Sequence, residues 1–190
     1  MNAGEIVTGH LVDAVGSTPA KASVTFLGLE PVDILRFVDG EDVVFASVGC
    51  SRHPMADPTA MVADTEAGPR AEVVARMRAS DPLTGLHRAL ATVAAAPAVE
   101  GLILVPDALI DLSEPLWTGS SCTAILLEPD AIDDCVLPAP AEPVRFLRAV
   151  PITANEAAWV RLKGAAALRE LWTESAIDVT DPHRGAAPLQ

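Results

Sequence analysis

The segment Gly49-Cys50-Ser51-Arg52-His53-Pro54-Met55 places a thiol, a hydroxyl and an imidazole close together in the sequence. A nucleophilic serine needs a base within hydrogen-bond reach and is usually held on a strained turn such as Gly-x-Ser-x-Gly. Here the second glycine is missing, and the sequence identifies no third group that would orient His53. A hydrolase that uses Ser51 and His53 is therefore the least favoured alternative. In the favoured interpretation Ser51 caps the end of a strand or turn, Pro54 stiffens the loop and Met55 fills an apolar gap.

Cys50 and His53 also have a Cys-x-x-His spacing that could begin a zinc site. Structural zinc sites usually supply a second closely spaced pair of ligands, whereas Cys122 and Cys135 are thirteen positions apart. Three widely spaced cysteines also do not match the disulfide framework of a small secreted protein. We therefore expect reduced thiols, no metal, no cofactor and no catalytic residue.

Length and composition favour one domain. Half of the 190 residues are apolar, which is enough to bury a substantial core. We predict a single domain at residues 1–180 and a loose tail at residues 181–190, which are rich in proline and glycine. No N-terminal stretch shows a basic start followed by a long apolar run, and no segment has the run of about 20 apolar residues needed to span a bilayer. We therefore expect a cytoplasmic protein that does not bind membranes.

The charge is strongly negative and unevenly distributed. A net charge of −13 argues against nucleic-acid binding, because phosphate contacts need clustered Lys and Arg. No Lys or Arg lies between Arg88 and Arg145, so this part of the chain should project a negative field. Such a field can maintain solubility, or it can steer a basic partner onto the protein. In the second interpretation the acidic docking face comprises Asp107, Asp111, Glu114, Glu128, Asp130, Asp133 and Asp134.

Hydrophobic spacing in the first half predicts one helix followed by strands. Apolar residues at helical spacing in residues 4–15, with Gly16 as a left-handed cap, predict a short amphipathic helix. Asp39-Gly40 is a hairpin turn signal, and residues 56–69 predict an exposed loop. Runs rich in Val, Phe, Ile and Leu predict strands at residues 21–28, 32–38, 42–48 and 71–77.

The second half combines helices with further strands. Asp81-Pro82 opens a helix whose apolar repeat should end at Pro97. Thr153 and Glu156 have the capping-box spacing with which another helix begins. Further strands are predicted at residues 99–105 and 123–127. Strands mixed with a few non-alternating helices predict an α+β fold, in which helices pack on a mixed or mostly antiparallel sheet.

The order of several local signals resembles that of the suppressor of fused family. The most specific signal is a strand that ends in Gly-x-Ser-x-x-Pro-Met, at Phe45 to Met55, followed by a strand with Arg-x-Glu, at Arg70 and Glu72. Cys50 departs from the family pattern, in which a larger apolar residue is more usual. The resemblance covers nearly the whole chain and also rests on Val32-Asp33-Ile34-Leu35-Arg36-Phe37, on Pro115-Leu116 with Gly119, on Val150-Pro151-Ile152-Thr153 with Glu156 and Trp159, and on Asp181-Pro182-His183-Arg184.

The resemblance implies a suppressor-of-fused-like domain that binds a protein partner through sheet edges and a polar loop and is not an enzyme. Animal relatives have two domains that hold a transcription factor's peptide between them, and this chain is similar only to their N-terminal part. Bacterial relatives are regarded as immunity proteins that neutralise a cognate toxin. We expect that role here, with a basic toxin domain as the partner. The alternative is a general adaptor that binds a peptide or protein by strand addition.

The candidate binding residues lie in the polar loop and at two further positions. Glu72 follows Arg70 in a predicted strand, where it either pairs with a cation across the sheet or faces a ligand. Trp117 lies in an irregular segment, where it serves either as an interface anchor or as core. The candidate binding residues are Gly49, Ser51, Arg52, His53, Pro54, Met55, Glu72 and Trp117.

Overall fold

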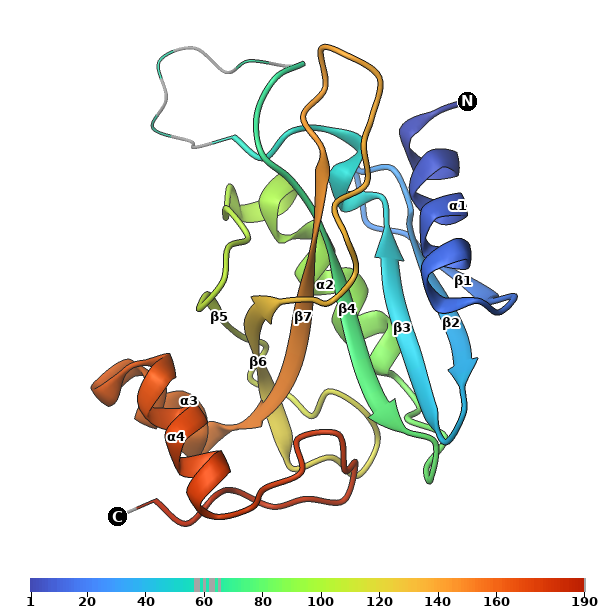
Figure 1. The fold of residues 1–190 in the computed structure, drawn as a ribbon. Helices are drawn as coiled ribbons and strands as arrows, with labels where there is room; N and C mark the ends of the chain where they lie inside the picture. Colours follow the sequence, from blue (N-terminus) through green and yellow to red (C-terminus); the bar gives the residue numbers. More distant parts are fainter. Residues whose placement is uncertain (57–58, 60, 62–63, 65, 190) are drawn as a thin grey trace.

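One mixed sheet organises the computed structural model, which describes residues 1–189 except 57–58, 60, 62–63 and 65. In these residues the sheet has seven strands in the order β1-β2-β3-β4-β7-β6-β5. All neighbouring strands are antiparallel except β4 and β7, which are parallel (Figure 1). The strands are β1 (Ala20–Val24), β2 (Val32–Asp39), β3 (Asp42–Val48), β4 (Arg70–Arg78), β5 (Leu109–Asp111), β6 (Cys122–Pro129) and β7 (Val144–Thr153). The predicted α+β fold with a mostly antiparallel sheet is confirmed.

Helices cover both faces of this sheet. α2 lies against one face, and α1 and the α3–α4 pair lie against the two ends of the other face (Figure 1). Within the described residues no helix combines the length and the hydrophobicity that a bilayer crossing requires. The helices are α1 (Ala3–Val15), α2 (Leu86–Glu100), α3 (Ala154–Lys163) and α4 (Ala165–Glu174), and the short 3-10 helix η1 (Cys50–Arg52) follows β3.

The helix ends follow the local sequence signals closely. α1 starts in a capping box formed by Asn2 and Glu5, and it ends at Gly16 in the left-handed conformation, with φ of 77°. α3 starts in the predicted capping box of Thr153 and Glu156. α2 starts at Leu86 and not at Asp81-Pro82, and it continues past Pro97 to Glu100, so both predicted ends of that helix are wrong by about one turn.

One predicted strand is not found in the structure, and two strands of the structure, β5 and β7, were not predicted. The predicted strand at residues 99–105 is wrong, because its first two residues end α2 and the others form no regular element. β5 is three residues long, and β7 contains Pro151 and two arginines, so neither has the alternating pattern of a typical strand. β7 nevertheless lies inside the sheet, between β4 and β6.

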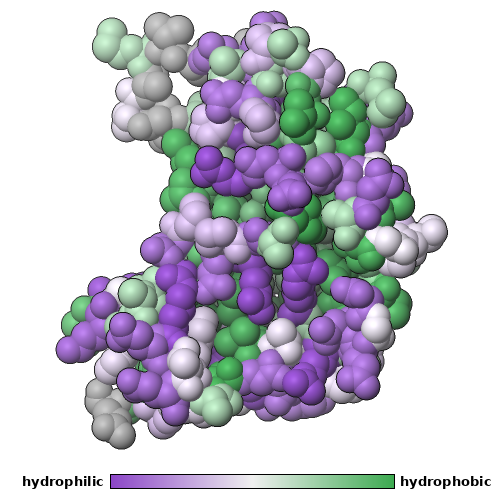
Figure 2. Space-filling model, in the orientation of Figure 1, coloured by the Kyte–Doolittle hydropathy of each residue, from purple (hydrophilic) through white to green (hydrophobic). Residues whose placement is uncertain are grey.

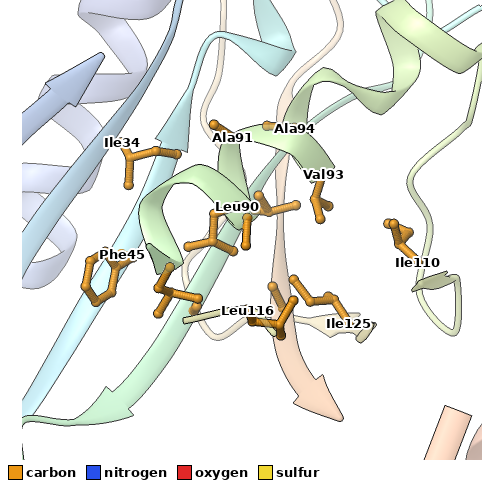
Figure 3. Packing of buried hydrophobic residues seen from close by; sticks show 14 of the residues in the cluster. Ile34, Phe45, Leu90, Ala91, Val93, Ala94, Ile110, Leu116 and Ile125 are labelled. Carbon is orange, nitrogen blue, oxygen red and sulfur yellow. The ribbon is translucent and has the colours of Figure 1, made fainter. Parts of the chain in front are cut away.

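The larger part of the hydrophobic core lies between α2 and the sheet. Figure 3 shows α2 side chains pointing toward those of the strands, with Leu90 between Ile34 and Phe45 on one side and Ile125 on the other. Aromatic residues are few, so this core consists mainly of Val, Leu, Ile and Ala. Burial of this apolar surface is the main stabilising contribution that fixes α2 on the sheet.

The sheet splits between β4 and β7, and the C-terminal segment closes the split. β4 pairs with β7 only from Arg70 to Val74. After Val74, β4 pairs only with β3, and after Arg148, β7 pairs only with β6. Residues 178–187 cross the opening: the amide of Arg78 donates to the carbonyl of Thr180 at 2.9 Å, and Arg184 Nη2 donates to the carbonyl of Pro151 at 2.7 Å. Within the segment expected to be a loose tail, Pro182, Arg184 and Ala187 are buried, whereas His183, Gly185 and Ala186 are exposed.

Candidate binding site at the Gly49–Met55 loop

The loop starts where β3 ends, and its first residue has a conformation that favours glycine. Gly49 has φ of 140°, and a Cβ atom there would lie 3.4 Å from both the carbonyl oxygen of Pro31 and Cα of Val32. The chain can therefore turn sharply beside β2 and enter η1.

A buried carboxylate on β4 holds the first half of the loop. Glu72 is fully buried and accepts hydrogen bonds from the amides of Gly49 at 2.8 Å and Ser51 at 2.9 Å, and from the Ser51 hydroxyl at 2.6 Å. Its other oxygen accepts a bond from the hydroxyl of Ser47, which itself accepts from the amide of Val73 at 2.9 Å. Bonds to an ionised acceptor are stronger than neutral ones, so this carboxylate fixes the loop backbone. The Glu72 carboxylate therefore points toward the backbone of the loop and not toward a ligand.

Arg70 holds the same loop from its carbonyl side. Its guanidinium donates to the carbonyls of Ser51 at 2.8 Å, Arg52 at 3.0 Å and Glu66 at 3.1 Å. Arg70 and Glu72 are two positions apart in β4, so both side chains leave the same face of the strand. Burial lowers the pKa of Arg70, although the charge of Glu142 partly opposes this effect. The Arg-x-Glu signal therefore marks two side chains that hold the loop: Glu72 accepts bonds from its amides, and Arg70 donates to its carbonyls.

The second half of the loop is fixed by Met55. Its amide donates to the carbonyl of Pro69 at 2.8 Å, and its sulfur accepts a bond from the amide of Leu104 at 3.3 Å. The side chain packs in the core below α2, which agrees with the prediction that Met55 fills an apolar gap. Pro54 packs so close to Gly68 that a Cβ atom there would lie 3.1 Å from the proline ring.

The exposed rim of the loop consists of Arg52 and His53. Arg52 forms an ion pair with Glu30 at 3.1 Å and donates to the carbonyl of Pro31 at 3.1 Å. The His53 side chain is 81% exposed, and its Nε2 atom lies 4.0 Å from the same carboxylate. Arg52 lines two hollows, and His53 lines only the second of them. One has about 730 Å³ and lies beside the first half of α1, and the other has about 420 Å³ and lies against the end of α2.

The structure does not pair Ser51 with His53. The Ser51 side chain is buried and its hydroxyl donates to Glu72, whereas His53 points to solvent beside Glu30. A serine nucleophile needs its base within hydrogen-bond reach. The predicted role of Ser51 as a cap at the end of a strand fits the observed bonds.

The three cysteines are free thiols. Burial, and to a smaller extent the charge of Glu72, raises the pKa of the Cys50 thiol well above its ordinary value. Burial also raises the pKa of Cys122 and Cys135, which lie in cores on opposite faces of the sheet. Neutral thiols are poor nucleophiles and poor metal ligands. Among the residues that the structure describes, no three His, Cys, Asp or Glu side chains are grouped as metal ligands would be.

Trp117 is not an interface anchor, so this prediction is wrong. Its side chain is 3% exposed and packs in the core below α2. The irregular segment is held down on both sides, because Leu116 donates to the carbonyl of Cys122 at 3.0 Å and Thr118 donates to the carbonyl of Thr84 at 2.9 Å. Burial of the large indole stabilises the fold, and in a protein with few aromatic residues this contribution is greater than an exposed indole would make.

The seven residues of the predicted acidic docking face do not form one free surface. Asp107 and Glu128 bind Arg169 at 2.6 and 2.7 Å, and Asp111 binds Arg161 at 2.8 Å. The Asp130 side chain is 1% exposed and binds Arg76 at 2.8 Å. These arginines lie outside the acidic stretch in sequence and reach it through α3, α4 and β4. In the described residues Glu114, Asp133 and Asp134 form no ion pair. The face shown in Figure 2 is mainly hydrophilic, with hydrophobic residues in small groups between the polar ones.

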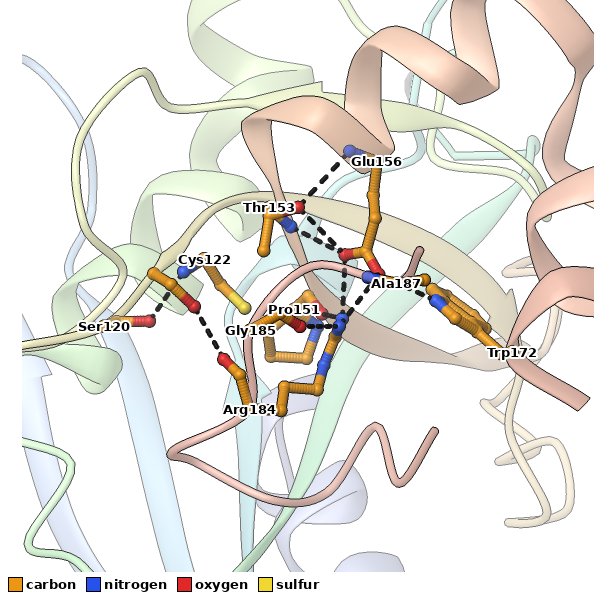
Figure 4. Close-up of polar contacts among 10 residues, drawn as sticks. Ser120, Cys122, Pro151, Thr153, Glu156, Trp172, Arg184, Gly185 and Ala187 are labelled. Atoms are coloured by element: carbon orange, nitrogen blue, oxygen red, sulfur yellow. Dashed lines mark hydrogen bonds and ion pairs between the residues drawn. The ribbon is translucent and has the colours of Figure 1, made fainter. Parts of the chain in front are cut away.

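A buried ion pair between Glu156 and Arg184, which the sequence did not reveal, joins α3 to the C-terminal segment. Glu156 accepts bonds from Arg184 at 2.8 and 3.0 Å and from Trp172 Nε1 at 2.9 Å (Figure 4). It also accepts a bond from the amide of Thr153 at 2.9 Å. Burial alone would raise the pKa of Glu156, but the bonds from Arg184, Thr153 and Trp172 hold this pKa below its usual value. The capping box therefore also anchors the C-terminal segment, and the only sequence signal for this was the position of Arg184 after Asp181-Pro182.

Comparison with known proteins explains why these signals occur together. The family described as suppressor of fused protein (SUFU) matches residues 28–185. The chain belongs to the suppressor of fused family. Both supports described above, Arg70 with Glu72 and Glu156 with Arg184, lie inside the matched region. A search of curated proteins found no match.

Solved structures of suppressor of fused proteins share the fold. A protein from Neisseria gonorrhoeae described as a SUFU homolog is 18% identical, with a TM-score of 0.66 over 98% of this chain and 97% of its own. The chain in the Sufu-Fu complex is 14% identical, with a TM-score of 0.69 over 98% of this chain and 92% of its own. Drosophila Suppressor of Fused is 16% identical, with a TM-score of 0.67 over 95% of this chain. This chain spans half of the Drosophila protein.

Proposed function

We propose that this chain is a cytoplasmic immunity protein, which neutralises a toxin by direct binding at the Gly49–Met55 loop and is not an enzyme. The observation that carries the proposal is a fixed backbone with an exposed rim. Glu72 and Arg70 hold the loop from inside, while Arg52 lines both neighbouring hollows and His53 lines the one of about 420 Å³. Because the loop is already ordered, a partner that binds it loses little of the binding energy to ordering.

Family membership supports protein binding as the general role. One suppressor of fused structure is a complex of Sufu with Fu. The geometry of Ser51 and His53 supports the absence of hydrolase chemistry at the loop, since the serine hydroxyl is bound by Glu72.

The charge supports a basic partner. The chain carries a net charge of −13, and Glu5, Glu30 and Asp33 line the larger hollow beside the loop. A cationic toxin surface would be attracted over a long range and would bind more weakly at high salt. Two of these carboxylates are themselves paired, Glu30 with Arg52 and Asp33 with Lys21, so the long-range attraction comes mainly from the net charge of the whole chain.

Capture from the native cell lysate at 50 and 500 mM NaCl tests this proposal. We expect a protein with a basic domain to be retained at low salt and released at high salt. Expressed alone, that protein should stop growth, and co-expression with this chain should restore growth. The double variant Glu30→Ala/His53→Ala should lose the partner, whereas the matched control Glu170→Ala/His183→Ala, which removes the same side-chain types far from the loop, should keep it. A harmless partner that both variants bind equally at both salt concentrations would refute the immunity role.

A general adaptor that binds by strand addition is the second candidate, because β1 is an edge strand. Among the described strands β1 pairs only with β2, so its other edge is open to a partner strand. Proline placed in turn at positions 20–24 tests this function. Where the amide points outward, proline leaves the protein folded and should abolish partner binding at any salt concentration. If every folded proline variant still binds the partner, strand addition at β1 is excluded.

A further inference from the structure

A small hollow on the α2 face of β1 differs in charge from the other hollows. It has a volume of about 220 Å³ and lies between the edge of the sheet and the segment that leads into α2. No Asp or Glu lines it, while Arg36 and His87 do. The hollows of about 730, 420, 360 and 140 Å³ each include at least one carboxylate. In a protein with a net charge of −13, this hollow is a local exception.

The strand register explains why the hollow exists. Ala22 pairs with Ile34 and Ala20 pairs with Arg36, so these side chains share one face of the sheet. The alanine methyl groups are too short to reach residues 82–85, which line the opposite side. Ile34, Phe45 and Leu83 are buried and form the apolar wall of the space that is left.

Arg36 is available for a ligand. Its guanidinium lies 5.9 Å from the centre of the Phe45 ring, and in the described residues it forms no ion pair. Lys21 also lines the hollow, but its ammonium binds Asp33 at 3.1 Å, on the other face of the sheet. A guanidinium beside an aromatic ring offers both a flat apolar surface and donors for a carboxylate.

We propose that this hollow binds a small apolar carboxylate. Its apolar group packs on Ile34, Phe45 and Leu83, and its carboxylate binds Arg36, with the imidazole of His87 as a second donor. A dry cavity of about 150 Å³ accepts benzene, so this hollow accepts a phenyl or branched alkyl group with a short acid chain. At physiological ionic strength the screening length is about 8 Å, so carboxylates elsewhere on the protein contribute little to the field at Arg36. The site is independent of the proposed immunity function, and its test uses no toxin.

NMR titration of the ¹⁵N-labelled protein at 150 mM NaCl tests the site with three probes. They are 3-phenylpropionate, N-acetylphenylalanine and the neutral N-acetylphenylalanine amide. We expect shifts at the amides of Ala20, Ala22, Ile34 and Leu83, with a dissociation constant on the order of 1 mM for the acids, as is usual for ligands of this size. The amide should bind at least about 5-fold more weakly. If N-acetylphenylalanine binds more tightly than phenylpropionate, the hollow takes the C-terminal residue of a chain. The reverse order indicates a free small acid.

Two variants and a matched control separate the charge from the cavity. Arg36→Gln should weaken both acids at least about 5-fold and leave the amide unchanged. Arg88→Gln makes the same charge change on α2 beside a different hollow, and it should alter nothing. Ala22→Phe should fill the space and abolish binding of all three probes, while signals far from β1 stay in place. Equal affinity for acid and amide, equal losses in the two glutamine variants, or shifts confined to another surface would each overturn the proposal.

Discussion

Replacing Glu72 by alanine should strongly destabilise the protein through the Gly49–Met55 loop. The carboxylate is the acceptor for the amides of Gly49 and Ser51 and for the hydroxyls of Ser47 and Ser51. The hydroxyls can rotate to other partners, but the two amides are fixed by the backbone. Each buried donor without a partner costs about 1–3 kcal/mol. Gly49 is only half-buried, and removal of a buried charge returns part of its desolvation cost, so we expect a loss of about 3–4 kcal/mol.

Glu72→Gln should cost less than Glu72→Ala. The amide keeps the size of the side chain and one oxygen acceptor, so the loop amides stay bonded. The bonds become neutral, and charge-assisted bonds are about twice as strong as neutral ones, which gives a loss of about 1–2 kcal/mol. Glu170→Ala is the control, because this exposed glutamate on α4 should contribute less than about 0.5 kcal/mol.

Urea unfolding followed by far-UV circular dichroism measures these free energies. The dependence on urea concentration should keep the same slope in all variants, since the fold buries the same surface. A loss below about 1 kcal/mol for Glu72→Ala, or equal losses for alanine and glutamine, would show that the carboxylate does not hold the loop.

Three further predictions follow from the buried groups. The pKa of Glu156 is lowered in the folded state, so its pairing with Arg184 stabilises the protein fully above the usual pKa near 4.5, and this contribution is lost as the pH falls through the lower folded pKa. Urea midpoints measured from pH 7 to pH 3 should therefore fall more steeply in the parent than in Glu156→Gln, and parallel curves would contradict the pairing. Trp117→Ala should lower the free energy of unfolding in urea by about 3–5 kcal/mol, as expected for a core indole. A loss below about 1 kcal/mol would show that the Trp117 side chain is not buried. Because burial raises the pKa of all three thiols, iodoacetamide at pH 8 should modify them at least about 10-fold more slowly in the folded than in the urea-unfolded protein, as followed by mass spectrometry, and equal rates would exclude their burial.

The sequence predicts β2 and β3 almost to the residue. β2 and β3 are paired on both sides and follow the apolar pattern closely. β7 is also internal, but Arg145 and Arg148 interrupt its pattern, and Pro151 has no amide to donate. The structure tolerates this proline because β4 pairs with β7 only as far as Arg148. A single sequence does not show where a neighbouring strand ends, so β7 was not predictable.

The loop itself was predictable, and its partners were not. Glycine, serine, proline and methionine marked Gly49 to Met55 as a shaped segment, but whether Glu72 faced a cation, a ligand or the loop depended on how β4 lies beside β3. The partners of the acidic stretch were likewise not predictable from the sequence. Its lack of Lys and Arg suggested a negative surface, but Arg161, Arg169 and Arg76 reach it from elements distant in the sequence.

The split between β4 and β7 also has a consequence for how the chain folds during synthesis. β1 to β4 pair with their sequence neighbours, so these pairs can form early, and α2, which covers them, follows at residues 86–100. The parallel pair of β4 and β7 joins Arg70 to Val144 and must wait for most of the chain. Arg184 arrives last, and its bonds to Pro151 and Glu156 close the structure. Until then the lower edges of β4 and β7 are open to other chains, which makes a shortened or stalled product prone to aggregation.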